Sequence, residues 1–479
     1  MASSSARSGA VHETARAVAS GRVSAAEVTR RTLDRLSDTA RPAHALNAVT
    51  LLCHDEALAE AVLVDERLRS GRDAGPLAGV PVLVKDLEDV AGLPTTMGSL
   101  LFADSAPKQQ DSTVPTRLRA AGAVVVGKSN LPEFAIEGFT DNLLFGATGN
   151  PWNPELSPGG SSGGSAAAVS AGLVPVATAT DGGGSIRIPA AFCGLVGLKP
   201  TNGVVGRWPA PDWIDFSTEG PFATTAHDLR LLLTVVSGPV AGDPTAVPWW
   251  VERRGRRPER LYRTDRFGPH GPLPDDVAAS FDAAVEQFAA TWGLGCDVVS
   301  PADLWPGHDP DDDWFTLATA EHVSRFGRAW VEESLPQMHP SSQAFMEWGL
   351  RIDLDAYLAA RRRRYEYVRA LDTLLGERGL LLSPTVAMSG WTLDGRLPGR
   401  PAELLPPDVY NTALQNITGH PALSLPAGNS PNGLPFGLQV TAPRYSEDLL
   451  LDVADVWEAA HPWPLNAPGY DGFVDAVLG

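Results

Sequence analysis

The run Thr180-Asp-Gly-Gly-Gly-Ser185-Ile-Arg-Ile-Pro189 places one serine directly after three glycines. Upstream lie a second glycine-serine run, Gly159-Gly-Ser-Ser-Gly-Gly-Ser165, and a lysine in an apolar segment, Val80-Pro-Val-Leu-Val-Lys85-Asp86. Serine is a weak nucleophile unless a nearby base takes its proton, and Ser-Lys pairs are an alternative to Ser-His-Asp. Together the three runs predict a serine hydrolase whose base is lysine rather than histidine.

Lysine is rare in this chain. Of the 38 Lys and Arg residues only four are lysines: Lys85, Lys108, Lys128 and Lys199. Arginine is used wherever a plain positive charge suffices, whereas lysine can lose its proton near neutral pH. This usage favours a chemical role for Lys85. The plainer interpretation, which Lys85 taken alone would favour, is a lysine at a strand end that pairs with Asp86.

The composition is that of a large globular protein. The chain has 479 residues, 43% of them hydrophobic, which is enough for a sizeable core. Its cysteines, Cys53, Cys193 and Cys296, are too few and too scattered for a disulfide framework, which favours a reducing compartment. The N-terminus has no apolar stretch of signal-peptide length, and no run approaches the roughly 20 apolar residues that span a bilayer. We therefore expect a cytoplasmic protein with no membrane partner.

The charge excludes other classes of function. A net charge of −19 argues against nucleic acid as a partner, because phosphate binding needs basic surface. The basic run Arg361–Arg364 lies in a predicted helix, where four consecutive residues point all round the axis, so a solvated face is expected. The ten histidines show no HExxH-like spacing, so no metal site is expected.

Short apolar runs alternate with helical segments, which indicates an α/β fold with a mainly parallel or mixed sheet. Helices are expected over 24–36, where Ser24-Ala-Ala-Glu27 forms a capping box, and over 57–70, 166–172, 277–291, 314–333, 353–377 and 449–460. Strands are expected over 79–84, 123–126, 174–177, 380–382 and 422–425. Residues 238–276, which are rich in Pro, Arg and Gly, predict a boundary or surface excursion.

One motif match is rejected. Gly122-Ala-Val-Val-Val-Gly127-Lys128-Ser129 fits the phosphate-loop pattern letter for letter. A phosphate loop needs a strand before the motif and a helix that starts at its lysine. Here the middle of the motif is itself an apolar strand, and Pro132 follows too closely for the helix. Lys128 is therefore expected to end a strand and anchor a turn.

Seven runs stand in order along the chain: Leu77-Ala-Gly-Val-Pro-Val-Leu-Val-Lys85-Asp86, Pro94-Thr-Thr-Met-Gly-Ser99, Gly159-Gly-Ser161-Ser-Gly-Gly164, Thr180–Pro189, Gly194-Leu-Val-Gly-Leu-Lys-Pro-Thr201, Asn416-Ile-Thr-Gly-His-Pro-Ala-Leu-Ser424 and Gly433-Leu-Pro-Phe-Gly-Leu-Gln439. Through them the chain resembles the amidase signature family of hydrolases, with only about 240–350 weakly covered. The resemblance implies one amidase domain over 1–479, with a signature core at about 75–225 and a variable helical and loop excursion at about 238–350. The implied fold is α/β, with a large mixed central β-sheet flanked by many helices.

The resemblance also implies the site. Ser185 matches the nucleophile, Ser161 the bridging serine, which is expected to follow a cis peptide bond after Gly160, and Lys85 the base. The backbone N–H groups of Gly182, Gly183, Gly184 and Ser185 match the oxyanion hole, and glycines there allow close approach of the carbonyl oxygen. The family's pocket loop matches Phe134, Ala135, Ile136, Glu137 and Gly138 on the acyl side.

The implied mechanism needs no metal or organic cofactor. Neutral Lys85 draws the proton of Ser161, which draws that of Ser185, and Ser185 attacks the carbonyl to form an acyl-enzyme that water cleaves. To act as a base, a lysine must have a pKa lowered towards ~7–8, which burial can produce.

The substrate is expected to be a small molecule. Trp208, Trp213 and Trp391 are plausible aromatic walls, although each could equally be core or surface, and an apolar aromatic pocket suits aryl or alkyl amides and carbamates. Short aliphatic amides are the second candidate, and an amidotransferase A-chain component that acts on aminoacyl-tRNA is the third. The non-enzyme alternative is an inactive binding homologue, against which the intact triad argues. The expected assembly is a monomer or a homodimer.

The departures from the family pattern are mild. The family usually has glycine where Ala179 stands and a larger residue where Gly182 stands. Its usual Lys-Pro-Thr-Tyr-Gly-Arg is here Lys199-Pro-Thr-Asn-Gly-Val204. Neither change touches the triad, so they put the substrate in doubt rather than the chemistry.

Overall fold

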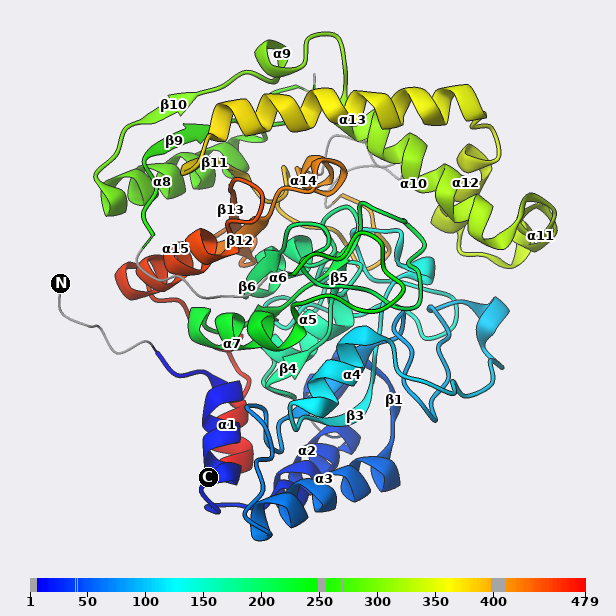
Figure 1. Ribbon diagram of the computed structural model, residues 1–479, viewed down its shortest axis with the longest axis vertical. Coiled ribbons are helices and arrows are strands. Elements are labelled where there is room, and N and C mark those ends of the chain that lie inside the picture. Colours follow the sequence, from blue (N-terminus) through cyan, green and yellow to red (C-terminus); the bar gives the residue numbers. More distant parts are fainter. Residues whose placement is uncertain (1–6, 39, 41, 249–255, 269–270, 398–410) are drawn as a thin grey trace.

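The computed structural model describes residues 7–38, 40, 42–248, 256–268, 271–397 and 411–479. Helices surround three β-sheets (Figure 1). The α-helices are α1 (Ala10–Ala19), α2 (Ala25–Ser37), α3 (His54–Arg69), α4 (Thr113–Ala120), α5 (Gly163–Ser170), α6 (Arg187–Cys193), α7 (Ala226–Val236), α8 (Asp275–Trp292), α9 (Pro301–Leu304), α10 (Pro310–Phe326), α11 (Arg328–Ser334), α12 (Pro340–Gly349), α13 (Leu354–Leu375), α14 (Ala413–Thr418) and α15 (Glu447–Ala460). Shorter helical turns are η1 (Pro42–Leu46), η2 (Leu100–Phe102), η3 (Glu133–Ala135), η4 (Leu335–Gln337) and η6 (Val474–Leu478).

The strands are β1 (Val49–Leu52), β2 (Pro81–Lys85), β3 (Val124–Ser129), β4 (Val176–Ala177), β5 (Thr180–Asp181), β6 (Val196–Lys199), β7 (Thr218–Glu219), β8 (Phe222–Ala223), β9 (Arg260–Arg263), β10 (Cys296–Val298), β11 (Gly379–Pro384), β12 (Ala422–Asn429) and β13 (Pro435–Thr441). They form a seven-stranded mixed sheet in the order β10-β9-β11-β13-β12-β6-β8, a four-stranded sheet in the order β1-β3-β2-β4, and the pair β5-β7. The predicted α/β fold with a large mixed sheet and many helices is confirmed.

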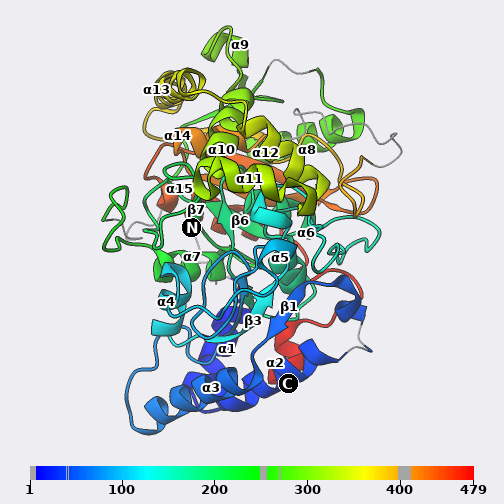
Figure 2. The same ribbon diagram turned by 90° about the vertical axis from the view of Figure 1, so that its right-hand side faces the viewer.

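The elements divide between two ends of the molecule. Helices α1, α2 and α3 lie at one end, where the C-terminal turn η6 packs against α1 and α2 (Figure 1). Helices α10 to α13 lie towards the opposite end, and the view turned by 90° keeps the same division (Figure 2). None of the described helices combines the length and apolar character needed to cross a membrane.

Local sequence rules explain several element ends. Ser24 caps α2 as the capping box predicts, because its side chain accepts a hydrogen bond from the N–H of Glu27 at 3.1 Å. The single helix expected over 314–333 is instead two helices, α10 and α11. Gly327, with φ at 88°, ends the first of them.

Residues 238–276 contain a strand that their composition hid. β9 pairs in parallel with both β10 and β11 within the seven-stranded sheet. Its Leu261 is buried, although the flanking sequence is rich in Arg and Pro. The segment expected to be a surface excursion therefore contributes to the main sheet.

The rejection of the phosphate loop is supported by the fold. The motif's Val124 to Ser129 form β3, which pairs in parallel with β2, and no helix starts at Lys128. The Lys128 ammonium is buried, donates to the carbonyl oxygen of Glu88 at 2.7 Å and pairs with Asp86 at 3.1 Å. Lys128 thus holds the turn after β2, as a structural cation.

Candidate active site

Lys85 ends the buried strand β2 and points its amine at two hydroxyl groups. Its Nζ lies 2.7 Å from Ser161 Oγ and 2.8 Å from Thr180 Oγ1, and the side chain has no exposed surface. Because Asp86 pairs with Lys128 instead, the interpretation of Lys85 as a strand-end lysine paired with Asp86 is wrong.

Burial changes the protonation of this lysine. Loss of solvation lowers the pKa of Lys85 to about 7, although the nearby carboxyl groups of Glu88, Asp181 and Glu219 oppose the shift. A large share of the Lys85 amine is therefore unprotonated at neutral pH. An unprotonated amine within hydrogen-bond distance of a hydroxyl group can accept its proton.

The two serines lie at the starts of adjacent helices. The Gly160–Ser161 peptide bond is cis, as expected, and Ser161 stands just before α5. Ser185 stands just before α6 and keeps 8% of its surface exposed. Ser161 and Ser185 line the same cavity, so the structure brings together the two hydroxyl groups that the sequence pattern predicts.

The three glycines before Ser185 are each packed against one side chain. A Cβ atom added to any of them would lie 2.0 to 2.5 Å from a side-chain atom of its neighbour, closer than real contacts allow. The pairs are Gly182 with Trp213, Gly183 with Trp314 and Gly184 with Thr412. Packing thus requires glycine here in addition to any need for close approach by a substrate.

Three side chains from later in the chain hold the carbonyl groups of this run. Asn416 donates to the carbonyl oxygen of Asp181 at 2.8 Å, Trp314 donates to that of Gly182 at 2.7 Å, and Thr412 donates to that of Gly183. In a trans peptide the N–H points away from the C=O. The N–H groups of Gly182 and Gly183 are therefore turned away from Asn416 and Trp314.

The predicted oxyanion hole needs one correction. The N–H of Gly184 donates to the carboxylate of Asp181 at 2.7 Å, so this N–H already has a partner. Gly184 also has a φ of 133°, a conformation that glycine adopts readily. The remaining predicted donors are the N–H groups of Gly182, Gly183 and Ser185.

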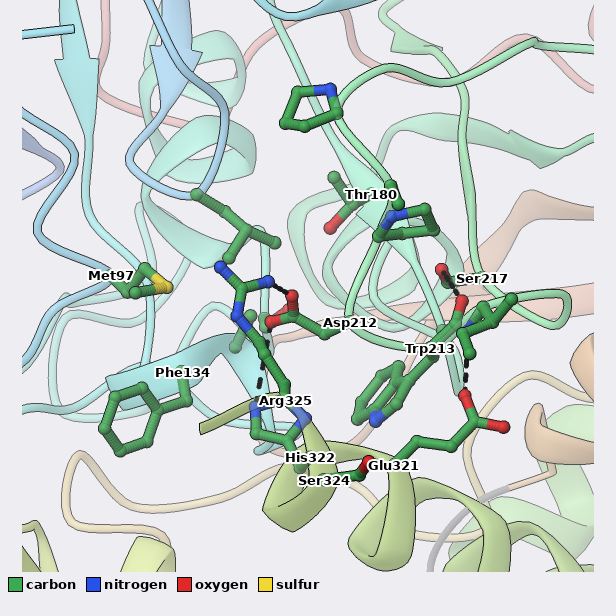
Figure 3. Close-up of a pocket in the computed structure, with 18 of the residues that line it drawn as sticks. Met97, Phe134, Thr180, Asp212, Trp213, Ser217, Glu321, His322, Ser324 and Arg325 are labelled. Atoms are coloured by element: carbon green, nitrogen blue, oxygen red, sulfur yellow. Dashed lines mark hydrogen bonds and ion pairs between the residues drawn. The ribbon is translucent and has the colours of Figure 1, made fainter. Parts of the chain in front are cut away.

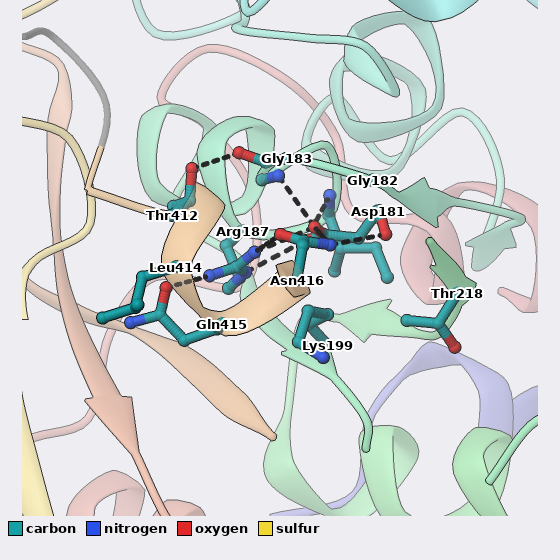
Figure 4. A network of polar contacts seen from close by, with 12 residues as sticks. Asp181, Gly182, Gly183, Arg187, Lys199, Thr218, Thr412, Leu414, Gln415 and Asn416 are labelled. Atoms are coloured by element: carbon teal, nitrogen blue, oxygen red, sulfur yellow. Dashed lines mark hydrogen bonds and ion pairs between the residues drawn. The ribbon is translucent and has the colours of Figure 1, made fainter. Parts of the chain in front are cut away.

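A buried ionic network fixes the start of α6 (Figure 4). Arg187 forms two hydrogen bonds with Asp181, at 2.9 and 3.0 Å, and both side chains are fully buried. Arg187 also donates to Asn416 at 2.7 Å and to Gln439 at 2.8 Å. Burial alone would raise the pKa of Asp181, but Arg187 outweighs burial and the pKa lies below its usual value.

The cavity that holds Ser161 and Ser185 has a volume of about 820 Å³. Met97 and Phe134 lie on one side of it, and Trp213 and Glu321 lie on the other (Figure 3). Its size is that of a small-molecule site. His322 also lines it, and burial lowers the pKa of this imidazole to about 3, which keeps it neutral.

Only part of the predicted pocket loop reaches this cavity. Phe134 and Ala135 line it, whereas Ile136, Glu137 and Gly138 are not among its lining residues. Burial raises the pKa of Glu137 to about 7.

The backbone is strained beside the cavity. The described residues include five non-glycine residues with a positive φ, and three of them, Met97, Phe134 and Ala135, line this cavity. Such strain gathers at functional sites, because the surrounding structure must enforce it.

The three candidate tryptophan walls have different positions. Trp208 and Trp213 line the cavity. Trp391 is fully buried in a separate apolar cluster, where its ring packs edge-on against Phe192. Trp391 is therefore a core residue.

Sequence reasoning missed the residues that position this site. Thr180 lies inside the quoted run, and its hydroxyl oxygen near a lysine was a usable signal. Trp314 and Thr412 hold the glycine run from 132 and 229 residues away along the chain, and no local pattern marks them. No three His, Cys, Asp or Glu side chains gather into a metal-binding group within the part of the chain that the structure describes.

Comparison with known proteins agrees with this geometry. Residues 27–451 match the sequence model of the family described as Amidase. The chain is 36% identical to the A component of the glutamyl-tRNA(Gln) amidotransferase of Synechococcus sp. (strain RCC307), over 94% of this chain and 97% of the relative. It is 37% identical to the putative amidase AmiB2 of Mycobacterium bovis (strain ATCC BAA-935 / AF2122/97), over 88% and 90% of the two chains.

A solved structure of a bacterial aryl acylamidase, one of the amidase signature enzymes, superposes with a TM-score of 0.85 at 28% identity and covers 98% of this chain and 99% of its own. The Lys85, Ser161 and Ser185 constellation thus stands in a fold and a sequence shared across this whole length, and the chain belongs to the amidase signature family.

Proposed function

We propose that this amidase signature enzyme hydrolyses the C–N bond of amides at Ser185, with Ser161 and Lys85 as its proton relay. The observation that carries the proposal is the 2.7 Å approach of the buried Lys85 amine to Ser161, whose hydroxyl shares a cavity with Ser185. Family membership supports amide hydrolysis as the class of reaction.

In the proposed reaction Ser185 Oγ attacks the substrate carbonyl while its proton passes to Ser161. The proton of Ser161 passes in turn to Lys85 Nζ. The oxyanion accepts hydrogen bonds from the N–H groups of Gly182, Gly183 and Ser185, which the braced carbonyl groups of the run help to orient. Collapse breaks the C–N bond, and the leaving nitrogen takes a proton back through Ser161. Water then attacks the ester by the same relay, releasing the acid and free Ser185.

Aryl and alkyl amides, together with N-aryl carbamates, are the substrates that the cavity favours. Its walls include Met97, Phe134 and Trp213, which suit an apolar or aromatic group. The similar aryl acylamidase structure supports the same class. Carbamates present a similar carbonyl to the same nucleophile.

An anionic substrate is disfavoured by the charges in the cavity. Its two basic side chains, Lys108 and Arg325, already pair with Asp89 and Asp212. Among its other acidic residues is Glu219, which has a buried carboxyl oxygen without a hydrogen-bond partner in the described structure. A substrate carboxylate placed here would lack a free cation.

The test is a hydrolysis panel of p-nitroacetanilide, an N-phenyl carbamate, acetamide and an anilide with a free carboxylate beside the scissile bond. We expect kcat/KM to be highest for the first two, with Ser185→Ala as the blank. If acetamide is the best substrate, the aryl and carbamate assignment is wrong and the short aliphatic amides replace it. If wild type and blank do not differ on any amide, the hydrolase proposal fails.

A second candidate function follows from the relatives named as components of a glutamyl-tRNA(Gln) amidotransferase. The net charge of −19 makes direct RNA binding unfavourable, so such a role would need a partner protein. We propose free glutamine as the discriminating substrate. Release of ammonia from glutamine at a higher kcat/KM than aniline release from acetanilide would favour this function over the first.

A further inference from the structure

Three large apolar side chains stand exposed at the mouth of the Ser185 cavity. Trp208, Ile214 and Leu354 are 51%, 58% and 69% exposed, and all three also line the cavity. Exposed apolar side chains scattered singly are ordinary on a protein surface, but a group around one opening marks a binding surface. We call these three residues the apolar rim.

The rim is held in place by polar contacts from several elements. Trp208 and Thr113, at the start of α4, exchange backbone and side-chain hydrogen bonds, including Trp208 N–H to Thr113 Oγ1 at 2.8 Å. The N–H of Ile214 donates to Glu321 on α10 at 2.8 Å. The buried Arg207 donates to the carbonyl oxygen of Ile214 at 3.0 Å. The exposed side chains are thus presented by a braced loop.

The third rim residue is fixed by a helix start. Leu354 is the first residue of α13, and its neighbour Asp353 caps that helix by accepting from the N–H of Ala356 at 2.8 Å. The rim therefore joins the 207–217 loop to the start of α13, with α10 between them in the lining of the same cavity.

Charges beside the rim neutralise one another. Arg325 pairs with Asp212, and Lys108 pairs with Asp89 at 3.2 Å. A ligand that crosses the mouth therefore meets apolar side chains and paired charges, a surface that favours an uncharged apolar group.

We propose that the apolar rim binds the far end of an elongated apolar substrate, so that the preferred amides carry an alkyl or aryl arm that reaches from Ser185 to Trp208 and Leu354. This inference rests on the proposed function, because it assigns the substrate class of the same site. The occupant is the substrate's own arm, since the rim residues belong to the lining of the candidate active site. Each methylene that the rim removes from water favours binding by about fourfold.

The test uses two series of anilides, in which methylene groups lengthen either the acyl chain or a para-alkyl group on the aniline ring. We expect log kcat/KM to rise with length in at least one series. Trp208→Ser and Leu354→Ser should each lower the ratio of kcat/KM for the longest to the shortest member by about five- to tenfold. Two variants are used so that a folding defect at the Trp208–Pro209 cis bond cannot decide the result.

Matched controls carry the same type of change away from the cavity. Tyr365→Ser alters an 82% exposed residue of the same helix as Leu354, and Trp348→Ser alters a tryptophan that is 47% exposed, close to the value for Trp208. Neither residue lines the cavity, so the length dependence should persist in both. An equal loss in the controls would overturn the rim proposal, as would an unchanged ratio in both rim variants.

Binding to Ser185→Ala protein separates the two proposals. Calorimetric titration with the longest anilide should show that Trp208→Ser, added to this background, weakens affinity about five- to tenfold. If wild type cleaves acetanilide but the rim variants leave affinity and length dependence intact, only the rim proposal fails. If wild type cleaves no amide, the proposed function fails first. If the rim changes only dissociate a dimer in sizing experiments, the rim is a contact between copies of the chain and the proposal is wrong.

Discussion

Adjacent residues in this chain carry different tasks. Asp86 neutralises Lys128, whereas Lys85 has no carboxylate within ion-pair distance in the described structure and reaches Ser161 and Thr180. An ion pair would stabilise the protonated amine and keep its pKa high. The separation of Lys85 from Asp86 is therefore what lets burial lower the pKa of this lysine to about 7.

The first prediction concerns the nucleophile. Ser185→Ala should lower kcat by about 10⁴-fold or more on p-nitroacetanilide, because no other hydroxyl can form the acyl-enzyme. The small change at a site already packed against neighbours should leave the melting temperature close to that of wild type. A variant that keeps a tenth of the activity would show that Ser185 is not the nucleophile.

The second prediction concerns the base. Wild-type kcat/KM should rise with pH through about 7, since Lys85 must lose its proton to accept that of Ser161 and its pKa is about 7. Lys85→Arg should be as inactive as Lys85→Ala, because arginine keeps its proton. An active arginine variant would mean that Lys85 supplies charge only.

Other groups near Lys85 titrate in the same range and need a control. Burial raises the pKa of Glu219 to about 7 and that of Glu88 to about 8. Glu219→Gln removes one of these acids and its negative charge, so the pH limb should remain and move to lower pH. Loss of the limb in Glu219→Gln would assign it to the acid instead of the lysine.

At the scale of elements, the catalytic geometry lies in the short turn between β5 and α6. The turn contains only Gly182 to Ile186, yet side chains of Trp314, Thr412 and Asn416 hold the three carbonyl groups at its start. The donors of the proposed oxyanion hole are thus oriented by α10, by α14 and by the residue that precedes α14. Such preorganised donors contribute a large part of the stabilisation of an oxyanion.

The third prediction tests this turn. Gly182→Ala places a Cβ atom 2.0 Å from Trp213, so either the turn or the indole must move. We expect kcat to fall by about 10²-fold or more, measured on p-nitroacetanilide, as for loss of one oxyanion donor.

Gly271→Ala is the matched control, because an added Cβ meets no atom within 4 Å there and the backbone has no positive φ. It should keep wild-type kcat. A Gly182→Ala protein with unchanged kcat would show that the turn does not need its present position.

At the scale of the whole molecule, one buried network joins distant parts of the chain. Arg187 at the start of α6 contacts Asp181 in β5, Asn416 and Gln415 in α14 and Gln439 in β13. The residues around the nucleophile and the C-terminal strands are thereby fixed as one unit. Buried charges tolerate this arrangement only while they remain paired.

The fourth prediction concerns this network. Arg187→Met leaves the buried Asp181 carboxylate without its cation, and we expect the free energy of unfolding to fall by about 3–5 kcal/mol. The urea midpoint measures the change. Arg16→Met is the control: its partner is Glu13 in an exposed pair, which contributes about 0–1 kcal/mol. Equal midpoints for the two variants would contradict a structural role for the Arg187 network.

The reacting groups could be predicted from the sequence because they lie in short contiguous runs. Lys85, Ser161 and Ser185 each stand in an apolar or glycine-rich context that is unusual for their residue type, and the α/β alternation follows from the spacing of apolar segments. Capping chemistry likewise placed the start of α2, since Ser24 and Glu27 interact within one turn. Local pattern is sufficient where the partners are close along the chain.

What depended on the folded chain were contacts between residues far apart in sequence. The partner of Asp86, the donor that holds Gly182 and the burial of Trp391 each depend on which segments pack together, and no local pattern encodes that choice. The same holds for β9, whose single buried leucine is hidden among charged residues until two neighbouring strands pair with it. The pKa of Lys85 is also a tertiary property, because desolvation requires the whole core to close around the amine, whereas the amine itself is present in the sequence from the start.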